Sequence, residues 1–133
     1  MLEILIGKKG TGKTKALIEK VNAASTVADG NIVFICHDMS DTYNVKSQVR
    51  MCTTKGLGMK SFDDLLFYIN GLLAGNYDIT NIFIDGVFKI VGSDSLDGAE
   101  HFINSIKKLS DVSFVISMSM GADEAPDYIK ELL

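Results

Sequence analysis

The chain has 133 residues, 47% hydrophobic and 23% charged, and a formal net charge of −4. This composition favours one globular domain over residues 1–133 and excludes wholesale disorder, while the negative charge makes nucleic acid an unlikely partner. The N-terminal apolar run is too short for a signal peptide, and no apolar run is long enough for a membrane span. We therefore expect a cytoplasmic protein.

The distribution of apolar residues predicts alternating strands and helices. Short runs rich in β-branched residues are separated by stretches with helical periodicity, which is typical of parallel βαβ units. In chain order we expect a strand over Leu2–Ile6, a helix over Lys13–Ala24, strands over Ile32–Cys36 and Val49–Thr53, a helix from Ser61 to about Gly75, a strand over Thr80–Ile84, a helix over Ser95–Leu109, a strand over Val112–Ile116 and a helix over Asp123–Leu133. These elements predict an α/β fold, a three-layer sandwich with a mainly parallel five-stranded sheet.

Local signals refine some of these boundaries. Ser61 is a good N-cap residue, and the two aspartates of the turn that follows favour the positive end of the helix dipole. Pro126 is tolerated in the first turn of the C-terminal helix. The segment Asp41–Gln48 permits a short helix, and Val87–Ser95 is expected to be a loop able to close over a ligand.

A glycine-rich loop lies between the first strand and the first helix. It matches the pattern G-x-x-x-x-G-K-[ST] without a departure, through Gly7, Lys8, Lys9, Gly10, Thr11, Gly12, Lys13 and Thr14. Glycines let the backbone approach a phosphate closely, and successive N–H groups at a helix start converge on an anion. Lys13 would place its charge on the β- and γ-phosphates, and the Thr14 hydroxyl would ligate Mg²⁺.

Residues 2–24 thus resemble the start of a P-loop NTPase, with residues 7–14 as the Walker A loop. The resemblance implies the P-loop NTPase fold and a bound nucleotide, Mg-ATP or another NTP. It also implies a Walker B acid at the tip of a later apolar strand, and Asn81-Ile82-Phe83-Ile84-Asp85 fits that description. In this superfamily Asp85 would hold Mg²⁺, mostly through water, so the implied catalytic residues are Lys13 and Asp85.

The spacing of the strands is similar to that of RecA-like and helicase-like cores, and type II thymidine kinases share the plan. In a RecA-like core, Val112–Ile116 should lie between the strands Leu2–Ile6 and Thr80–Ile84 in one parallel sheet. Direct pairing of those two outer strands would instead indicate the kinase and GTPase division of the superfamily.

The chain also departs from these relatives. RecA-like ATPases usually follow the Walker B Asp with a Glu that activates water, whereas Gly86 stands here, so an evident general base is missing. Arg50 is the only arginine, which disfavours phosphotransferases that use arginine clusters. With two cysteines, the chain lacks the zinc ribbon of thymidine kinases, and we expect both thiols to be reduced and half-buried.

Other polar residues follow the predicted strands and would face the same edge of the sheet, where ligands of parallel α/β folds bind. Asp38 is the candidate general base in the absence of the usual Glu, although an Asp there can equally cap a turn. His37 has the same two interpretations. Ser117 or Ser119 would sense the γ-phosphate, as a polar residue after that strand does in RecA-like folds.

The leading functional hypothesis is a small nucleotide-binding ATPase or switch that turns over slowly unless a protein partner completes its site. One alternative is a small-molecule or nucleoside kinase that uses the same loop. Another is a non-enzymatic interaction module whose loop merely docks a nucleotide or phosphate.

Overall fold

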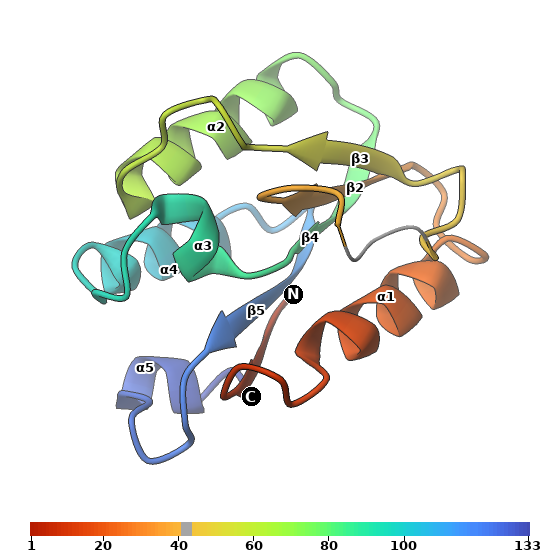
Figure 1. Ribbon diagram of the computed structural model, residues 1–133. Coiled ribbons are helices and arrows are strands. Elements are labelled where there is room, and N and C mark those ends of the chain that lie inside the picture. The colour runs from red at the N-terminus through yellow and green to blue at the C-terminus, as the bar shows by residue number, and fades with distance from the viewer. Residues whose placement is uncertain (41–43) are drawn as a thin grey trace.

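The computed structural model describes residues 1–40 and 44–133. Figure 1 shows its elements, which are β1 (Leu2–Gly7), α1 (Lys13–Ala24), β2 (Asn31–Cys36), β3 (Arg50–Thr53), α2 (Phe62–Ala74), β4 (Ile79–Ile84), α3 (Val87–Val91), α4 (Ala99–Lys107), β5 (Ser113–Ser119) and α5 (Asp127–Lys130). All five expected strands are present, and the first helix has the predicted bounds.

The strands form one sheet in the order β1-β5-β4-β2-β3, and every neighbouring pair is parallel. The expected α/β class with a five-stranded parallel sheet is therefore confirmed. β5 pairs with β1 on one side and with β4 on the other, so β1 and β4 do not touch. This order is the one expected of a RecA-like core and differs from that expected of the kinase and GTPase division.

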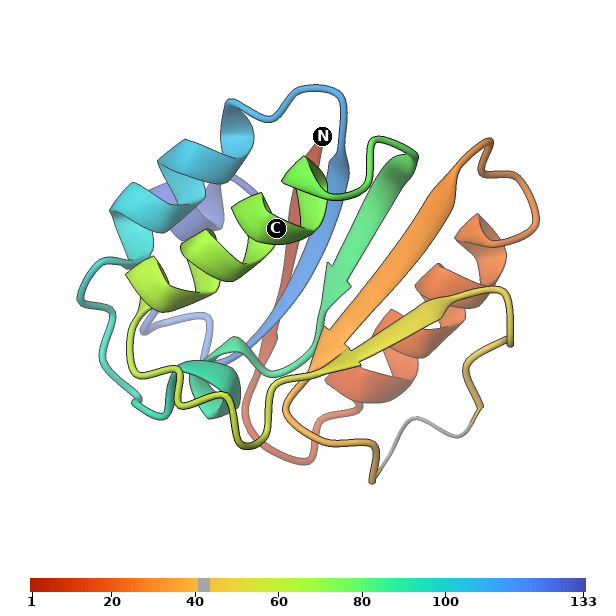
Figure 2. The same cartoon turned by 90° about the horizontal axis from the view of Figure 1, so that it is seen from above.

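Helices cover both faces of the sheet, but unequally. Figure 2 shows α1 on one face and both α2 and α4 on the other. Because strand side chains alternate, Phe34 packs on the α1 side while Val33 and Ile35 pack on the opposite side. The smaller core beneath α1, here called the α1-face core, consists of Leu17, Ile18, Val21, Ile32, Phe34, Cys36, Val49, Phe83 and Val115.

The start of α2 confirms the cap expected from the sequence. The Ser61 hydroxyl accepts a hydrogen bond from the backbone N–H of Asp64 at 3.1 Å, and the Asp64 carboxylate accepts from the N–H of Lys60 at 2.8 Å. The Ser61 hydroxyl satisfies one of the backbone donors that a helix start leaves without an intrahelical partner, and Asp64 holds the residue before the cap.

Replacing Ser61 with alanine should therefore lower the free energy of unfolding by about 1 kcal/mol, because the N–H of Asp64 loses its acceptor. Urea denaturation followed by circular dichroism measures this change. Ser61→Thr keeps a hydroxyl and is the control. An alanine variant as stable as Ser61→Thr would show that the cap contributes little.

The segment between β4 and α4 differs from the prediction. Val87–Ser95, expected to be a loop, begins with the short helix α3, and the next helix starts at Ala99 rather than Ser95. The Ser93 and Ser95 hydroxyls accept hydrogen bonds from the backbone N–H groups of residues 95 and 97, and Gly98 has φ of 80°. Such local side-chain bonds compete with helix formation, and the left-handed glycine sets the start.

The C-terminal helix is also shorter than predicted. α5 covers only Asp127–Lys130, and Pro126 is its N-cap with ψ of 165° instead of a first-turn residue. A residue before proline is disfavoured in the helical conformation, so Ala125 cannot extend the helix backwards. The helix expected over Asp123–Leu133 is wrong in its first four residues for this reason, and it also ends at Lys130, three residues before the predicted end.

Two further expectations concern less regular regions. Of the short helix permitted over Asp41–Gln48, residues 41–43 lie outside the described part, and residues 44–48 form turns and bends rather than a helix. In the part of the chain that the structure describes, none of the helices has the length and apolar character required to cross a membrane.

Candidate functional site

The loop of residues 7–14 connects β1 to α1 at the carboxyl edge of the sheet. Gly10 and Gly12 have φ of 85° and 86°, which side chains other than glycine rarely adopt. A Cβ at Gly7 would collide with the side chain of Thr11. The glycines are therefore required by the path of the backbone, and α1 begins directly after the turn that they make.

The carbonyl oxygen of Lys8 holds this loop together. It accepts hydrogen bonds from the Lys13 ammonium at 3.1 Å, from the Thr11 hydroxyl at 2.7 Å and from the Thr11 N–H at 3.2 Å. Burial lowers the pKa of Lys13, and the negative charge of Asp85 partly opposes this effect. Lys13 is thus a partly desolvated cation folded over the loop, an arrangement that favours a nearby anion.

Asp85 lies opposite the start of α1, immediately after β4. Its two carboxylate oxygens each accept from the Thr14 hydroxyl at 3.1 Å, and Oδ1 also accepts from the Ser117 hydroxyl at 2.9 Å. The Ser117 oxygen in turn accepts from the N–H of Gly86 at 2.7 Å. Three elements, α1, β4 and β5, therefore converge on one carboxylate.

The pair formed by Thr14 and Asp85 fits a magnesium ion. Mg²⁺ prefers oxygen ligands and is usually held by one or two carboxylates together with waters and the phosphates of a substrate. Among the described residues, no group of three or more His, Cys, Asp or Glu side chains could hold a metal by itself. A cation at this place would depend on the nucleotide for most of its ligands.

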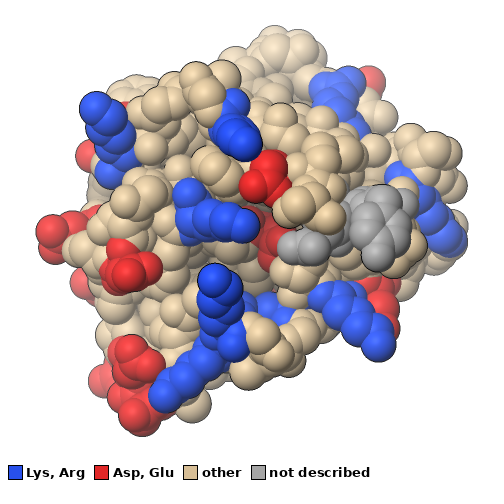
Figure 3. Space-filling model, in the orientation of Figure 1, with Lys and Arg blue, Asp and Glu red and all other residues tan. Residues whose placement is uncertain are grey.

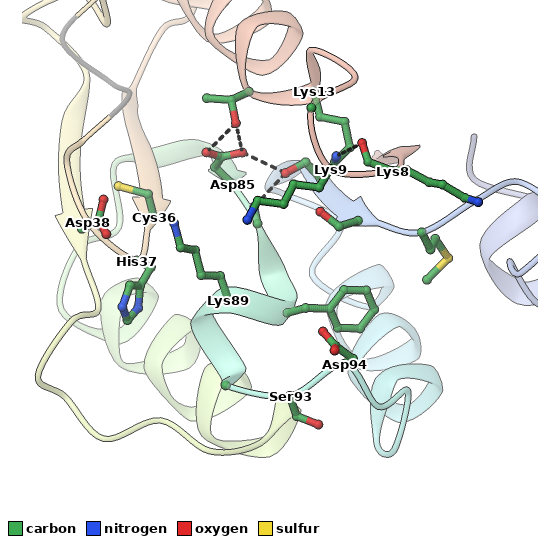
Figure 4. A pocket seen from close by; sticks show the side chains of 18 of the residues that line it. Lys8, Lys9, Lys13, Cys36, His37, Asp38, Asp85, Lys89, Ser93 and Asp94 are labelled. Atoms are coloured by element: carbon green, nitrogen blue, oxygen red, sulfur yellow. Dashed lines mark hydrogen bonds between the residues drawn. The ribbon is translucent and has the colours of Figure 1, made fainter.

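A cleft of about 1190 Å³ opens over the loop and Asp85. Lys8, Lys9, Lys13 and Lys89 line it, together with Asp85 at the centre (Figure 4). Figure 3 shows basic side chains gathered around a small central acidic patch on one face of the molecule. The cleft therefore offers an anion several ammonium groups, although the chain as a whole is acidic.

Lys89 is a basic residue of this cleft that sequence reasoning did not single out. It is the one charged residue in the apolar run Val-Phe-Lys-Ile-Val that follows Asp85-Gly86. The sequence analysis expects this run to be a loop, and a loop gives no reason to single out Lys89. In a short buried helix, by contrast, the one polar residue is the one exposed to solvent.

Asp38 and His37 lie on the rim of the same cleft, beyond Asp85 on the β2 side. The Asp38 carboxylate accepts from the Ser40 hydroxyl at 2.5 Å and from the Ser40 N–H at 3.0 Å, and these two bonds hold its pKa below the usual value. A carboxylate stabilised in its charged form is a weaker base. His37 Nδ1 is buried without a hydrogen-bond partner in the described structure.

The remaining candidates are divided between the two edges of the sheet. Ser119 is exposed and lines the cleft, whereas Ser117 is buried and bound to Asp85. Arg50 starts β3 at the amino edge, opposite the edge that carries the loop, so it does not reach the site within one chain. His101 is exposed on α4 and does not line the cleft.

The two cysteines are free thiols. Cys36 points into the α1-face core and Cys52 packs against the core on the opposite face, so the sheet separates them. Burial, followed by the negative charges of Asp85 and Asp38, raises the pKa of Cys36 to about 11. Cys36 lines the cleft as a neutral thiol and is unsuited to act as a nucleophile at neutral pH.

No protein-family model matches this chain, and no curated protein matches it significantly.

Proposed function

We propose that this protein binds a nucleoside triphosphate with Mg²⁺ in the cleft, and that it is a P-loop NTPase with a RecA-like core. The observation that carries this proposal is the contact of the Thr14 hydroxyl with both oxygens of Asp85 at 3.1 Å. The two residues are 71 positions apart in the sequence, yet they meet at the start of the helix that follows the glycine-rich loop.

Each part of the site has a role in this proposal. The backbone N–H groups of residues 7–14 surround the phosphates, and Lys13 leaves the Lys8 carbonyl to contact the β- and γ-phosphates. Thr14 and Asp85 would hold Mg²⁺, which would supply positive charge to the phosphates when bound. Ser117 fixes the orientation of the Asp85 carboxylate. The strand order supports the RecA-like assignment, because β5 separates β1 from β4.

We further propose that the isolated protein hydrolyses its nucleotide slowly. Gly86 has φ of 69° and caps α3, so the position that carries a water-activating Glu in many relatives has no side chain. Arg50 lies at the opposite edge of the sheet. The site therefore fits a nucleotide-dependent switch or an ATPase that needs a protein partner to supply the missing groups.

Isothermal titration with ATP, GTP and ADP in the presence of Mg²⁺ tests the binding proposal. We expect micromolar or tighter binding of at least one triphosphate, and weaker binding when EDTA removes the metal. A phosphate-release assay on the same sample then measures turnover. Lack of binding by every nucleotide at millimolar concentration would contradict the proposal, whereas transfer of phosphate to a small molecule would indicate a kinase.

A further inference from the structure

The cleft contains a cation that the phosphate-loop motif does not include. Lys89 is the one exposed residue of the five-residue helix α3, and it lines the cleft. The other four residues are at most 8% exposed; they are Val87, Phe88, Ile90 and Val91. Because those four side chains are buried, Lys89 is the residue of α3 whose side chain is exposed, and it faces the cleft.

The backbone beneath Lys89 is held firmly. Left-handed glycines, Gly86 with φ of 69° and Gly92 with φ of 70°, begin and end α3. The carbonyl of Phe88 accepts from the N–H groups of Gly92 and Ser93, and the Phe88 ring meets that of Phe62 edge-on at 6.4 Å. The Cα of Lys89 is therefore fixed, while its long side chain remains free to follow a ligand.

Lys89 lies on the side of the cleft that carries Asp38 and Asp85. A Cβ built on Gly86 would be 3.8 Å from the Cβ of Lys89, so Lys89 stands next to the position that a water-activating Glu would occupy. Figure 4 shows its side chain extending into the pocket on the side of Asp38, with Lys8 at the other end. Lys8 approaches Gly121, in the loop after β5.

Lys89 forms no salt bridge within the described part of the chain. Over residues 1–40 and 44–133, the one salt bridge joins Lys20 to Glu3, and neither of these residues lines the cleft. Asp38 feels the positive charge of Lys89, but Ser40 binds its Oδ1 and no salt bridge joins the two residues within the described part of the chain. The Lys89 ammonium lies in the same cleft as Asp85 and has no salt-bridge partner among the described residues, so it is available to bind a phosphate.

We propose that Lys89 binds the terminal phosphate of the nucleotide and thereby makes the site select triphosphates over diphosphates. This inference rests on the proposed function, because it assumes that residues 7–14 hold the inner phosphates. With the inner phosphates on residues 7–14, the terminal phosphate would lie toward Asp85, which would hold Mg²⁺, and toward Lys89 on the same side of the cleft. The protein thus places a cation next to the position where related enzymes place a base, which favours holding the triphosphate over cleaving it.

Titration of wild type, Lys89→Ala and Lys89→Arg with Mg²⁺ and either ADP or the slowly hydrolysed analogue AMP-PNP tests this proposal. We expect Lys89→Ala to bind AMP-PNP about tenfold more weakly and ADP less than about twofold more weakly, as for one lost charge-assisted contact. Lys89→Arg should retain most of the preference. Thermal unfolding checks that the variants are folded, which is expected because the Lys89 side chain is exposed.

Lys15→Ala is the matched control, since it removes the same charge from an exposed position that does not line the cleft. It should leave the ratio of the two dissociation constants unchanged. An equal loss for both nucleotides in Lys89→Ala, or no loss, would overturn the role of Lys89 while leaving the proposed function intact. If the wild type binds neither nucleotide, the proposed function fails, and this inference fails with it.

Discussion

Replacing Lys13 with alanine should weaken nucleotide binding by about 2 kcal/mol or more, roughly 30-fold in the dissociation constant. Lys13 is partly desolvated, and among the described residues its ammonium donates a hydrogen bond to the neutral carbonyl of Lys8, so phosphate oxygens are stronger partners for it. Isothermal titration with Mg²⁺ and AMP-PNP measures the loss directly, without interference from hydrolysis.

Lys15→Ala is the control for this experiment. Lys15 carries the same charge two residues further along α1, but it is exposed and does not line the cleft. We expect its removal to change the affinity less than twofold, with an effect that vanishes at high salt because exposed charges are screened. Unchanged affinity in Lys13→Ala would contradict the assignment of residues 7–14 as a phosphate loop.

The second large effect concerns turnover. Purified protein should release phosphate well below ~1 s⁻¹, the low end of typical enzymes. Residue 86 is a glycine with no side chain to activate water, and Arg50, the one arginine of the sequence, starts β3 at the edge of the sheet opposite the cleft. An arginine finger alone contributes ~10³–10⁵ in rate in related reactions. Steady-state phosphate release at saturating ATP and Mg²⁺ is the measurement.

Asp38→Asn tests whether any residual turnover depends on Asp38 as a general base. The bonds from Ser40 stabilise the charged form of Asp38 and lower its pKa, so it should be a poor base, and the variant should hydrolyse at the wild-type rate. Asp85→Asn is the reference for a damaged metal site and should be slower than both. Turnover above ~1 s⁻¹ that disappears in Asp38→Asn would instead identify an autonomous ATPase with Asp38 as its base.

The sequence predicts the regular elements of this fold because their signals are local. α1 has an apolar face and follows a glycine-rich turn, and α2 has the Ser61 cap. The errors arise where short elements depend on their surroundings. α3 is too short for a helical period to appear, and it forms because the core buries four of its five side chains. Pro126 precedes the start of α5 instead of lying in its first turn, and its local sequence permits either position.

The candidate site was predictable in its residue types but not in its connections. The motif names Thr14, and the position after an apolar strand names Asp85, yet their hydrogen bond depends on the strand order. The bond from Ser117 to Asp85 likewise requires β5 to lie beside β4. Lys89 could have been found from its isolation within an apolar run, had that run been recognised as buried.

The unequal covering of the sheet by helices makes α1 the helix expected to detach first in partial unfolding. Among the described helices, α1 alone covers its face, and it packs there through Leu17, Ile18 and Val21. Its first turn is also the end of the phosphate loop. Partial unfolding that detaches α1 would expose the smaller of the two cores, so it should cost less free energy than global unfolding. A ligand bound at residues 7–14 suppresses that local event by mass action, so occupancy of the cleft should set how fast the amides of α1 exchange with solvent.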